Sequence, residues 1–153
     1  MNWLIDLVTN HFFVVGVSSW LTAQVAKTII HALLNKKLDL TRLFGDGGMP
    51  SGHSATVVSV ATLSALVYGT GSFEFALSGI LAIIVCHDAT GVRRETGKQA
   101  IIINEMIQIF EELKAPLETE IKLKEFVGHS PVQVLAGMLL GALNAVLMYL
   151  FVF

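Results

Sequence analysis

Two histidines stand where a helix is expected to begin, and each has neighbours that suit a phosphate group. The stretch "MPSGHS" (residues 49–54) contains His53, and "GHSPVQVLAG" (residues 128–137) contains His129. A helix N-terminus offers unpaired N–H groups and a partial positive charge, and both favour an anion. Two imidazoles at two helix starts therefore indicate phosphate chemistry. The plainer alternative is a pair of capped helices with incidental histidines.

Serine and proline residues mark both helix starts. Ser51 is a favourable N-cap for a helix that begins at Gly52. Ser130 is expected to cap the second helix, with Pro131 at its first position and Gln133 completing a capping box. Both motifs thus predict a histidine within about one turn of a helix N-terminus.

The composition places these helices in a membrane. The 153 residues are 54% hydrophobic and 14% charged, whereas about 25% charged residues is usual in a soluble domain. A run of about 20 apolar residues can cross a bilayer as a helix. We therefore expect one all-α domain over residues 1–153, an integral membrane helical bundle. Four spans are predicted, at about 12–34, 52–69, 73–90 and 131–153.

The longest polar region lies between the third and fourth spans and has an amphipathic pattern. Ile103, Met106 and Phe110 recur at steps of three and four, with polar residues such as Asn104 on the other face. This period predicts a surface helix at about 98–114, lying on the membrane surface or against the bundle.

Basic residues predict the orientation. Lys and Arg lie in the loops after the first and third spans, and none lies in the second loop or beyond the outer spans. The positive-inside rule places those two loops in the cytoplasm and both termini outside. Both histidine motifs are then expected at the cytoplasmic face.

Several other functions are disfavoured. A net charge of -2 gives no basic field for nucleic acid. His87 and Asp88 are neighbours, but no second pair shows metal-ligand spacing, so we expect no metal. Cys86 lies in an apolar run and is expected to be a small buried hydrophobe.

Two glycines in the fourth span predict a close helix contact. Gly137 and Gly141 form a G-x-x-x-G spacing, which lets two helix backbones approach each other in lipid. The partner is either another helix of the same bundle or a second copy of the chain in a homodimer.

The two motifs together resemble signatures of the type 2 phosphatidic acid phosphatase (PAP2) superfamily, which includes vanadium haloperoxidases. "MPSGHS" looks like its second signature, and "HSPVQVLAG" is similar to its third. With "DATGVRRETGKQA" between them, nearly the whole chain resembles the divergent PAP2 (DUF212) group of small bacterial and plant membrane proteins. The resemblance favours a bacterial cell membrane.

The resemblance implies hydrolysis of a lipid phosphate monoester, from an isoprenoid or a glycerolipid, through a phosphohistidine. No metal or cofactor takes part, the partner is a membrane lipid, and vanadate is the expected inhibitor. His129 matches the nucleophile and His53 the acid that protonates the leaving alkoxide, roles that suit an imidazole. Ser51 and Gly52 match phosphate-binding positions.

The cationic positions of the family are only partly matched. Where the third signature has an arginine, this chain has Leu123, and the resemblance makes Arg93 or Arg94 the replacement. Positive-inside anchoring is the alternative for both. For the first signature the candidates include Arg42 and Lys27. A lysine within a membrane helix is costly and typically functional, with snorkelling to the interface as the alternative.

Gln133 occupies the position of a family aspartate that orients the nucleophile and stabilises its positive charge. Glutamine can form the hydrogen bond but brings no charge, and an aspartate-to-amide change costs about 10⁴ in rate in a serine protease. Asp88 and Glu125 are candidate substitutes. The alternative function is therefore a weak or inactive protein that binds or transports a lipid phosphate. A membrane-buried site disfavours vanadate-dependent halide oxidation.

Overall fold

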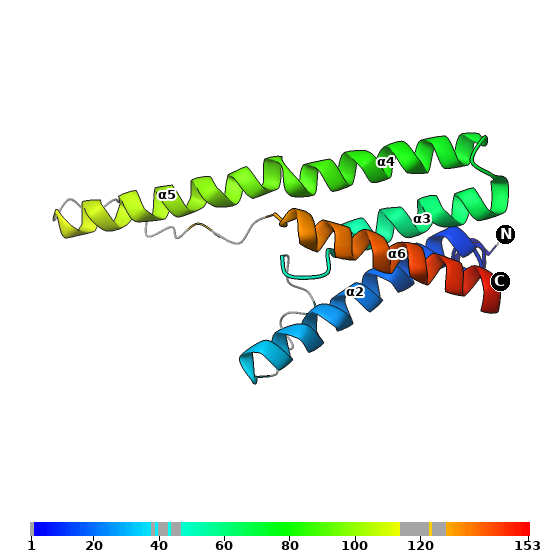
Figure 1. The fold of residues 1–153 in the computed structure, drawn as a ribbon, viewed down its shortest axis with the longest axis horizontal. Helices are drawn as coiled ribbons and strands as arrows, with labels where there is room; N and C mark the ends of the chain where they lie inside the picture. The colour runs from blue at the N-terminus through cyan, green and yellow to red at the C-terminus, as the bar shows by residue number, and fades with distance from the viewer. Residues whose placement is uncertain (1, 38, 40–42, 44–46, 114–122, 124–127) are drawn as a thin grey trace.

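Six α-helices form the described part of the chain. The computed structural model describes residues 2–37, 39, 43, 47–113, 123 and 128–153. These ranges contain no strand, so the all-α prediction is confirmed (Figure 1). The helices are α1 (Trp3–Val8), α2 (His11–Asn35), α3 (Gly52–Tyr68), α4 (Phe73–Thr90), α5 (Val92–Glu112) and α6 (Pro131–Phe151).

Three helical runs among the described residues have the length and composition to cross a membrane. They are α2, α6 and the run from α4 into α5. Helix α3 is apolar but has 17 residues, which is the lower end of the range of about 17–25 that a crossing needs. The bounds of α2, α3, α4 and α6 agree closely with the four predicted spans.

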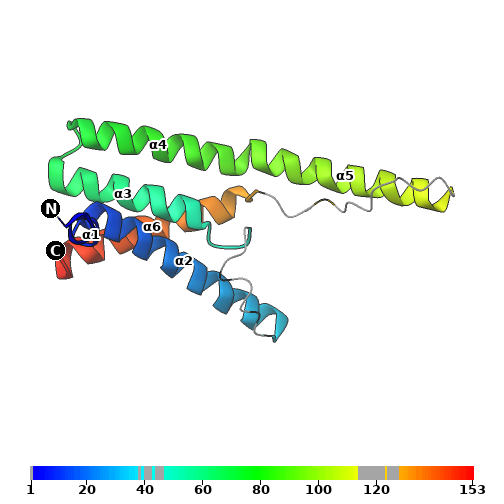
Figure 2. The ribbon, with the colours of Figure 1, turned by 180° about the vertical axis from the view of Figure 1, so that it is seen from behind.

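Helix α5 begins at Val92, earlier than the surface helix predicted from residue 98. The N–H of Gly91 still donates to His87 O at 2.9 Å, and α5 continues beyond the bundle in nearly the direction of α4 (Figures 1 and 2). Among the described helices α5 contacts only α4, and the predicted packing of the surface helix against the bundle stays a prediction. Contact with a membrane surface stays a prediction.

Asn104 departs from its predicted place on the polar face of α5. Its side chain is buried. Its Nδ2 donates to Leu123 O at 2.9 Å, and its Oδ1 accepts the Leu123 N–H at 3.0 Å. The side-chain amide therefore binds both backbone groups of Leu123 and holds that point of the chain against α5.

Helix α3 is the centre of the bundle and packs against α2, α4 and α6 (Figure 2). A Cβ on Gly137 would overlap the Ser51 carbonyl oxygen, and one on Gly141 would overlap that of Ala55. Only glycine permits this backbone contact. The G-x-x-x-G spacing is therefore used inside the bundle, and the predicted homodimer stays a prediction that has to use another surface.

A polar contact joins α2 to α6 within the apolar helices. Asn144 Nδ2 donates to Ser19 Oγ at 2.7 Å and to Ser18 Oγ at 3.0 Å. In lipid, where hydrophobic drive between helices is weak, interhelical hydrogen bonds and small residues hold helices together. This contact fixes α6 across the bundle, and α6 carries one of the two histidine motifs at its start.

Candidate functional site

One end of the bundle brings together the starts of α3 and α6 and the end of α4, away from the chain termini (Figures 1 and 2). Two backbone hydrogen bonds join these elements. The His129 N–H donates to Ala89 O at 2.9 Å, and the Ser51 N–H donates to Gln133 O at 3.0 Å. The two sequence motifs are therefore in direct contact.

The predicted caps are confirmed at both helix starts. Ser51 Oγ accepts the Ser54 N–H at the start of α3. At the start of α6, Pro131 takes the first helical position, and Ser130 and Gln133 form the complete capping box. These local bonds fix the direction in which each motif leaves its helix.

A polar pocket of about 280 Å³ lies beside this junction. Its walls come from the loop before α3, the first turns of α5 and the turn that begins α6. The predicted nucleophile lies in the wall, together with glycines and basic side chains. The residues that matter most below are Gly47, Gly48, Arg94, Lys98, His129 and Gln133.

The imidazole of His129 contacts the side chain of Gln133. The residue is 6% exposed, and its Nδ1 lies 3.4 Å from Gln133 Oε1. The same oxygen accepts the Ser130 N–H at 2.9 Å. Since a backbone N–H can only donate, the Gln133 atom that it meets has to be the amide oxygen, and the same oxygen faces the ring of His129. An acceptor at Nδ1 favours the tautomer with its proton there and a lone pair on Nε2, the form that a nucleophile needs.

The loop before α3 supplies a glycine wall. Gly47 and Gly48 have φ angles of 81° and 84°, a region that favours glycine. A Cβ on Gly48 would lie 3.2 Å from Lys27 Cγ. Lys27 is 6% exposed, and its Nζ lies 2.6 Å from Gln24 Oε1. Lys27 thus supports the loop from α2 without lining the pocket, and its contact with a phosphate stays a prediction.

His53 does not line the pocket that contains His129. It is exposed and lines an apolar pocket of about 340 Å³ between α2, α3 and α4, with Trp20 and Val57. Ser54 and Ala55 face the interior of the bundle, and the helical turn directs His53 away from them. The role of His53 as a general acid stays a prediction.

Comparison with known proteins agrees with these motifs. A family model described as the divergent PAP2 family matches residues 8–144. The chain belongs to the divergent PAP2 family. It is also 40% identical over 156 aligned residues to the uncharacterized membrane protein YuiD of Bacillus subtilis (strain 168), covering 95% of this chain and 99% of that protein. No solved structure matches it. Apolar helices and this relative together make the chain an integral membrane protein.

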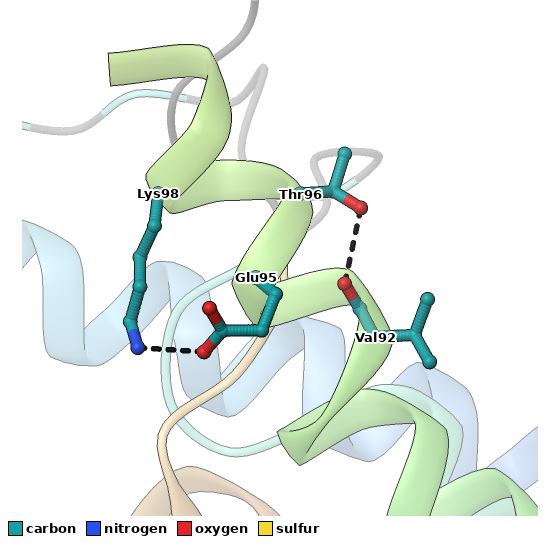
Figure 3. Close-up of polar contacts among 4 residues, drawn as sticks. All are labelled: Val92, Glu95, Thr96 and Lys98. Atoms are coloured by element: carbon teal, nitrogen blue, oxygen red, sulfur yellow. Dashed lines mark hydrogen bonds and ion pairs between the residues drawn. The ribbon is translucent and has the colours of Figure 1, made fainter. Parts of the chain in front are cut away.

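Arg94, one of the two arginines that the resemblance offers, lines the pocket, and its contact with a phosphate stays a prediction. Lys98, one turn later on α5, joins it and was missed by the sequence analysis. Its Nζ lies 2.6 Å from Glu95 Oε1 on the exposed surface (Figure 3). An exposed ion pair contributes little stability, so Lys98 can turn to a phosphate at small cost. The signal was the i, i+4 spacing, which puts Arg94 and Lys98 on one helical face.

Ser51 and Gly52 do not line the pocket. Ser51 is fully buried, and its Oγ accepts the Ser54 hydroxyl at 3.0 Å. A Cβ on Gly52 would lie 3.3 Å from Trp20 Cδ1. Both residues hold α3 in place here, and their predicted contact with phosphate stays a prediction.

The remaining predicted residues are placed as follows. Asp88 is half-buried on α4 and does not line the pocket. Within the described ranges, no three His, Cys, Asp or Glu side chains are grouped as metal ligands, and metal independence stays a prediction. Arg42 and Glu125, and the side chain of Arg93, lie outside the described residues.

Proposed function

We propose that this divergent PAP2 protein hydrolyses the phosphate monoester of a membrane lipid through a phosphohistidine at His129. One observation carries the proposal: a buried histidine, oriented by Gln133, shares a pocket with Arg94 and Lys98 at the end of an apolar bundle. Phosphoryl transfer needs a positioned nucleophile and positive charge around the phosphate oxygens, and these four side chains supply both.

The chemistry has two steps. First, Nε2 of His129 forms a bond to phosphorus while the bond from phosphorus to the lipid oxygen breaks, and the leaving alkoxide takes up a proton. Water then attacks phosphorus, and the N–P bond breaks to release inorganic phosphate and the imidazole. Dividing one displacement into two is the usual gain from covalent catalysis. The assignment of the proton to His53 rests on the family resemblance alone.

The position of the pocket suits a lipid substrate. It lies where apolar helices end and the basic residues of α5 begin, so a phosphate can bind while its hydrocarbon stays in the bilayer. The basic loops on this side support a cytoplasmic orientation in a bacterial membrane through the positive-inside rule. Both the orientation and the membrane are part of the proposal.

Phosphate release from a panel of isoprenoid and glycerolipid phosphates tests this function. Purified protein in detergent with EDTA is expected to release phosphate, and vanadate is expected to inhibit it. Acid-labile label transferred from a ³²P-labelled substrate to the chain would identify the phosphohistidine. Binding of these lipids by folded protein without any release would contradict hydrolysis.

The second candidate function, a lipid-phosphate binder or transporter, is favoured by the neutral side chain of Gln133. Replacing Gln133 by glutamate tests whether its neutral side chain limits hydrolysis. In Gln133→Glu the capping box is kept, because glutamate serves at this position, and a carboxylate lies beside Nδ1 of His129. It would stabilise the positive ring in the transition state. We therefore expect phosphate release to rise about 10- to 1,000-fold, which is less than the roughly 10⁴-fold loss that an aspartate-to-amide change causes in a serine protease.

Gln108→Glu is the matched control, since Gln108 is exposed on α5 outside the pocket. It makes the same change of charge and is expected to leave the rate of phosphate release unchanged. Equal rates for Gln133→Glu and wild type, at equal unfolding temperature, would mean that a charge at this position is not what limits catalysis.

A further inference from the structure

A second, apolar pocket lies on the other side of the first turn of α6. It has a volume of about 490 Å³ and is formed by α3, α4 and α6. Ser130 and Gln133 face the polar pocket, whereas Pro131 and Val134 line the apolar one. The hydrogen bond from the His129 N–H to Ala89 O ties α4 to α6 beside both. The first turn of α6 therefore has the polar pocket on one face and this apolar pocket, which we call the groove, on the other.

Most of the residues that line this groove are apolar. They include Ala82, Ile83, Val134, Leu135 and Met138, with His87 and Thr90 at the end toward the site. Apolar walls with a few polar groups at one end are typical of a pocket that takes an apolar ligand. Both α4 and α6 have the composition of membrane-crossing helices, so we expect the groove to open to the hydrocarbon region of the bilayer.

We propose that this groove holds the hydrocarbon chain of the same lipid whose phosphate occupies the His129 pocket. The proposal rests on the proposed function and adds the path of the substrate: the chain runs between α4 and α6 and the headgroup turns over Pro131 toward His129. The other apolar pocket, which His53 lines, is formed by α2, α3 and α4 and shares no part of α6. It therefore lacks this connection to the nucleophile.

Cys86 provides a probe of the groove without any substitution. It is the one cysteine of the sequence, it is half-buried, and it lines the groove. We expect dodecyl phosphate to slow the alkylation of Cys86 by monobromobimane about fivefold or more, since a pocketed ligand buries most of its surface. Inorganic phosphate does not reach the groove, and dodecanol lacks the headgroup that holds the chain there, so neither is expected to protect the thiol.

Leu135→Trp gives an independent test by filling the groove. Leu135 is 54% exposed, so the larger ring can be accommodated without entering the core. Its affinity for radiolabelled dodecyl phosphate is expected to fall about tenfold or more, since an occupied pocket excludes the chain, while binding of inorganic phosphate stays unchanged. Leu139→Trp is the matched control, because Leu139 is exposed one turn further along α6 and does not line the groove.

The outcomes separate this proposal from the proposed function. Dodecyl phosphate that binds without protecting Cys86 would overturn the groove, and so would equal protection by dodecanol. Protection of Cys86 without phosphate release from any lipid would support the groove and count against hydrolysis. Binding that falls equally in Leu135→Trp and Leu139→Trp would also overturn the groove.

Discussion

Gly141→Ala is expected to lower the free energy of unfolding, the largest effect on stability that we predict. A Cβ at this position would overlap the Ala55 carbonyl oxygen and lie 2.9 Å from Ala55 Cα. Neither atom can move without shifting α3, because both belong to its backbone. Overpacking costs about 1–3 kcal/mol and occasionally more. We expect the upper end, about 3 kcal/mol or more, from a typical total of about 5–15 kcal/mol.

Gly79→Ala is the matched control, since a Cβ on Gly79 in α4 would meet nothing within 4 Å. This substitution is expected to be neutral or to stabilise by up to about 1 kcal/mol through helix propensity. Thermal unfolding followed by circular dichroism should place Gly141→Ala at least about 6 °C below Gly79→Ala, at roughly 2–4 °C per kcal/mol. Equal midpoints for the two variants would show that α3 and α6 do not make this backbone contact.

His129→Ala is expected to abolish phosphate release, the largest effect on activity. Removing the nucleophile of a covalent hydrolase costs up to about 10⁶ in rate, and we expect at least about 10³. The fold should survive, because His129 joins the bundle through its backbone N–H to Ala89 O, which alanine keeps. Phosphate release and the unfolding temperature should be measured on the same preparation.

His11→Ala is the control for this prediction. His11 begins α2 at the opposite end of the bundle and is stacked on Phe153, so the rate of phosphate release should not change. Retention of activity in His129→Ala would rule out the phosphohistidine. His53→Ala adds a separate measurement: a loss as large as that of His129→Ala would show that His53 reaches the substrate, as the family resemblance implies.

Local sequence determined the helices of this protein well. The bounds of α3 and α6 followed from Ser51 and from the Ser130, Pro131 and Gln133 cap, because capping bonds connect residues within one turn. The spans followed from runs of apolar residues, and the family followed from motifs within the chain. Each of these signals is contiguous in the sequence, so no knowledge of long-range packing is needed to find it.

Tertiary structure decided which of these residues meet. Both histidines lie at helix starts, yet His129 lines the polar pocket and His53 lines an apolar one. The side of a helix that faces a neighbour depends on how the helices cross, which motif spacing does not specify. The way in which α3 and α6 cross also places Gly141 against the backbone of α3, and not against a second copy of the chain. Lys98 reaches the pocket because α5 continues from α4 in nearly the same direction. That direction depends on the backbone conformation where the two helices join, which the hydrophobic periodicity of α5 does not specify.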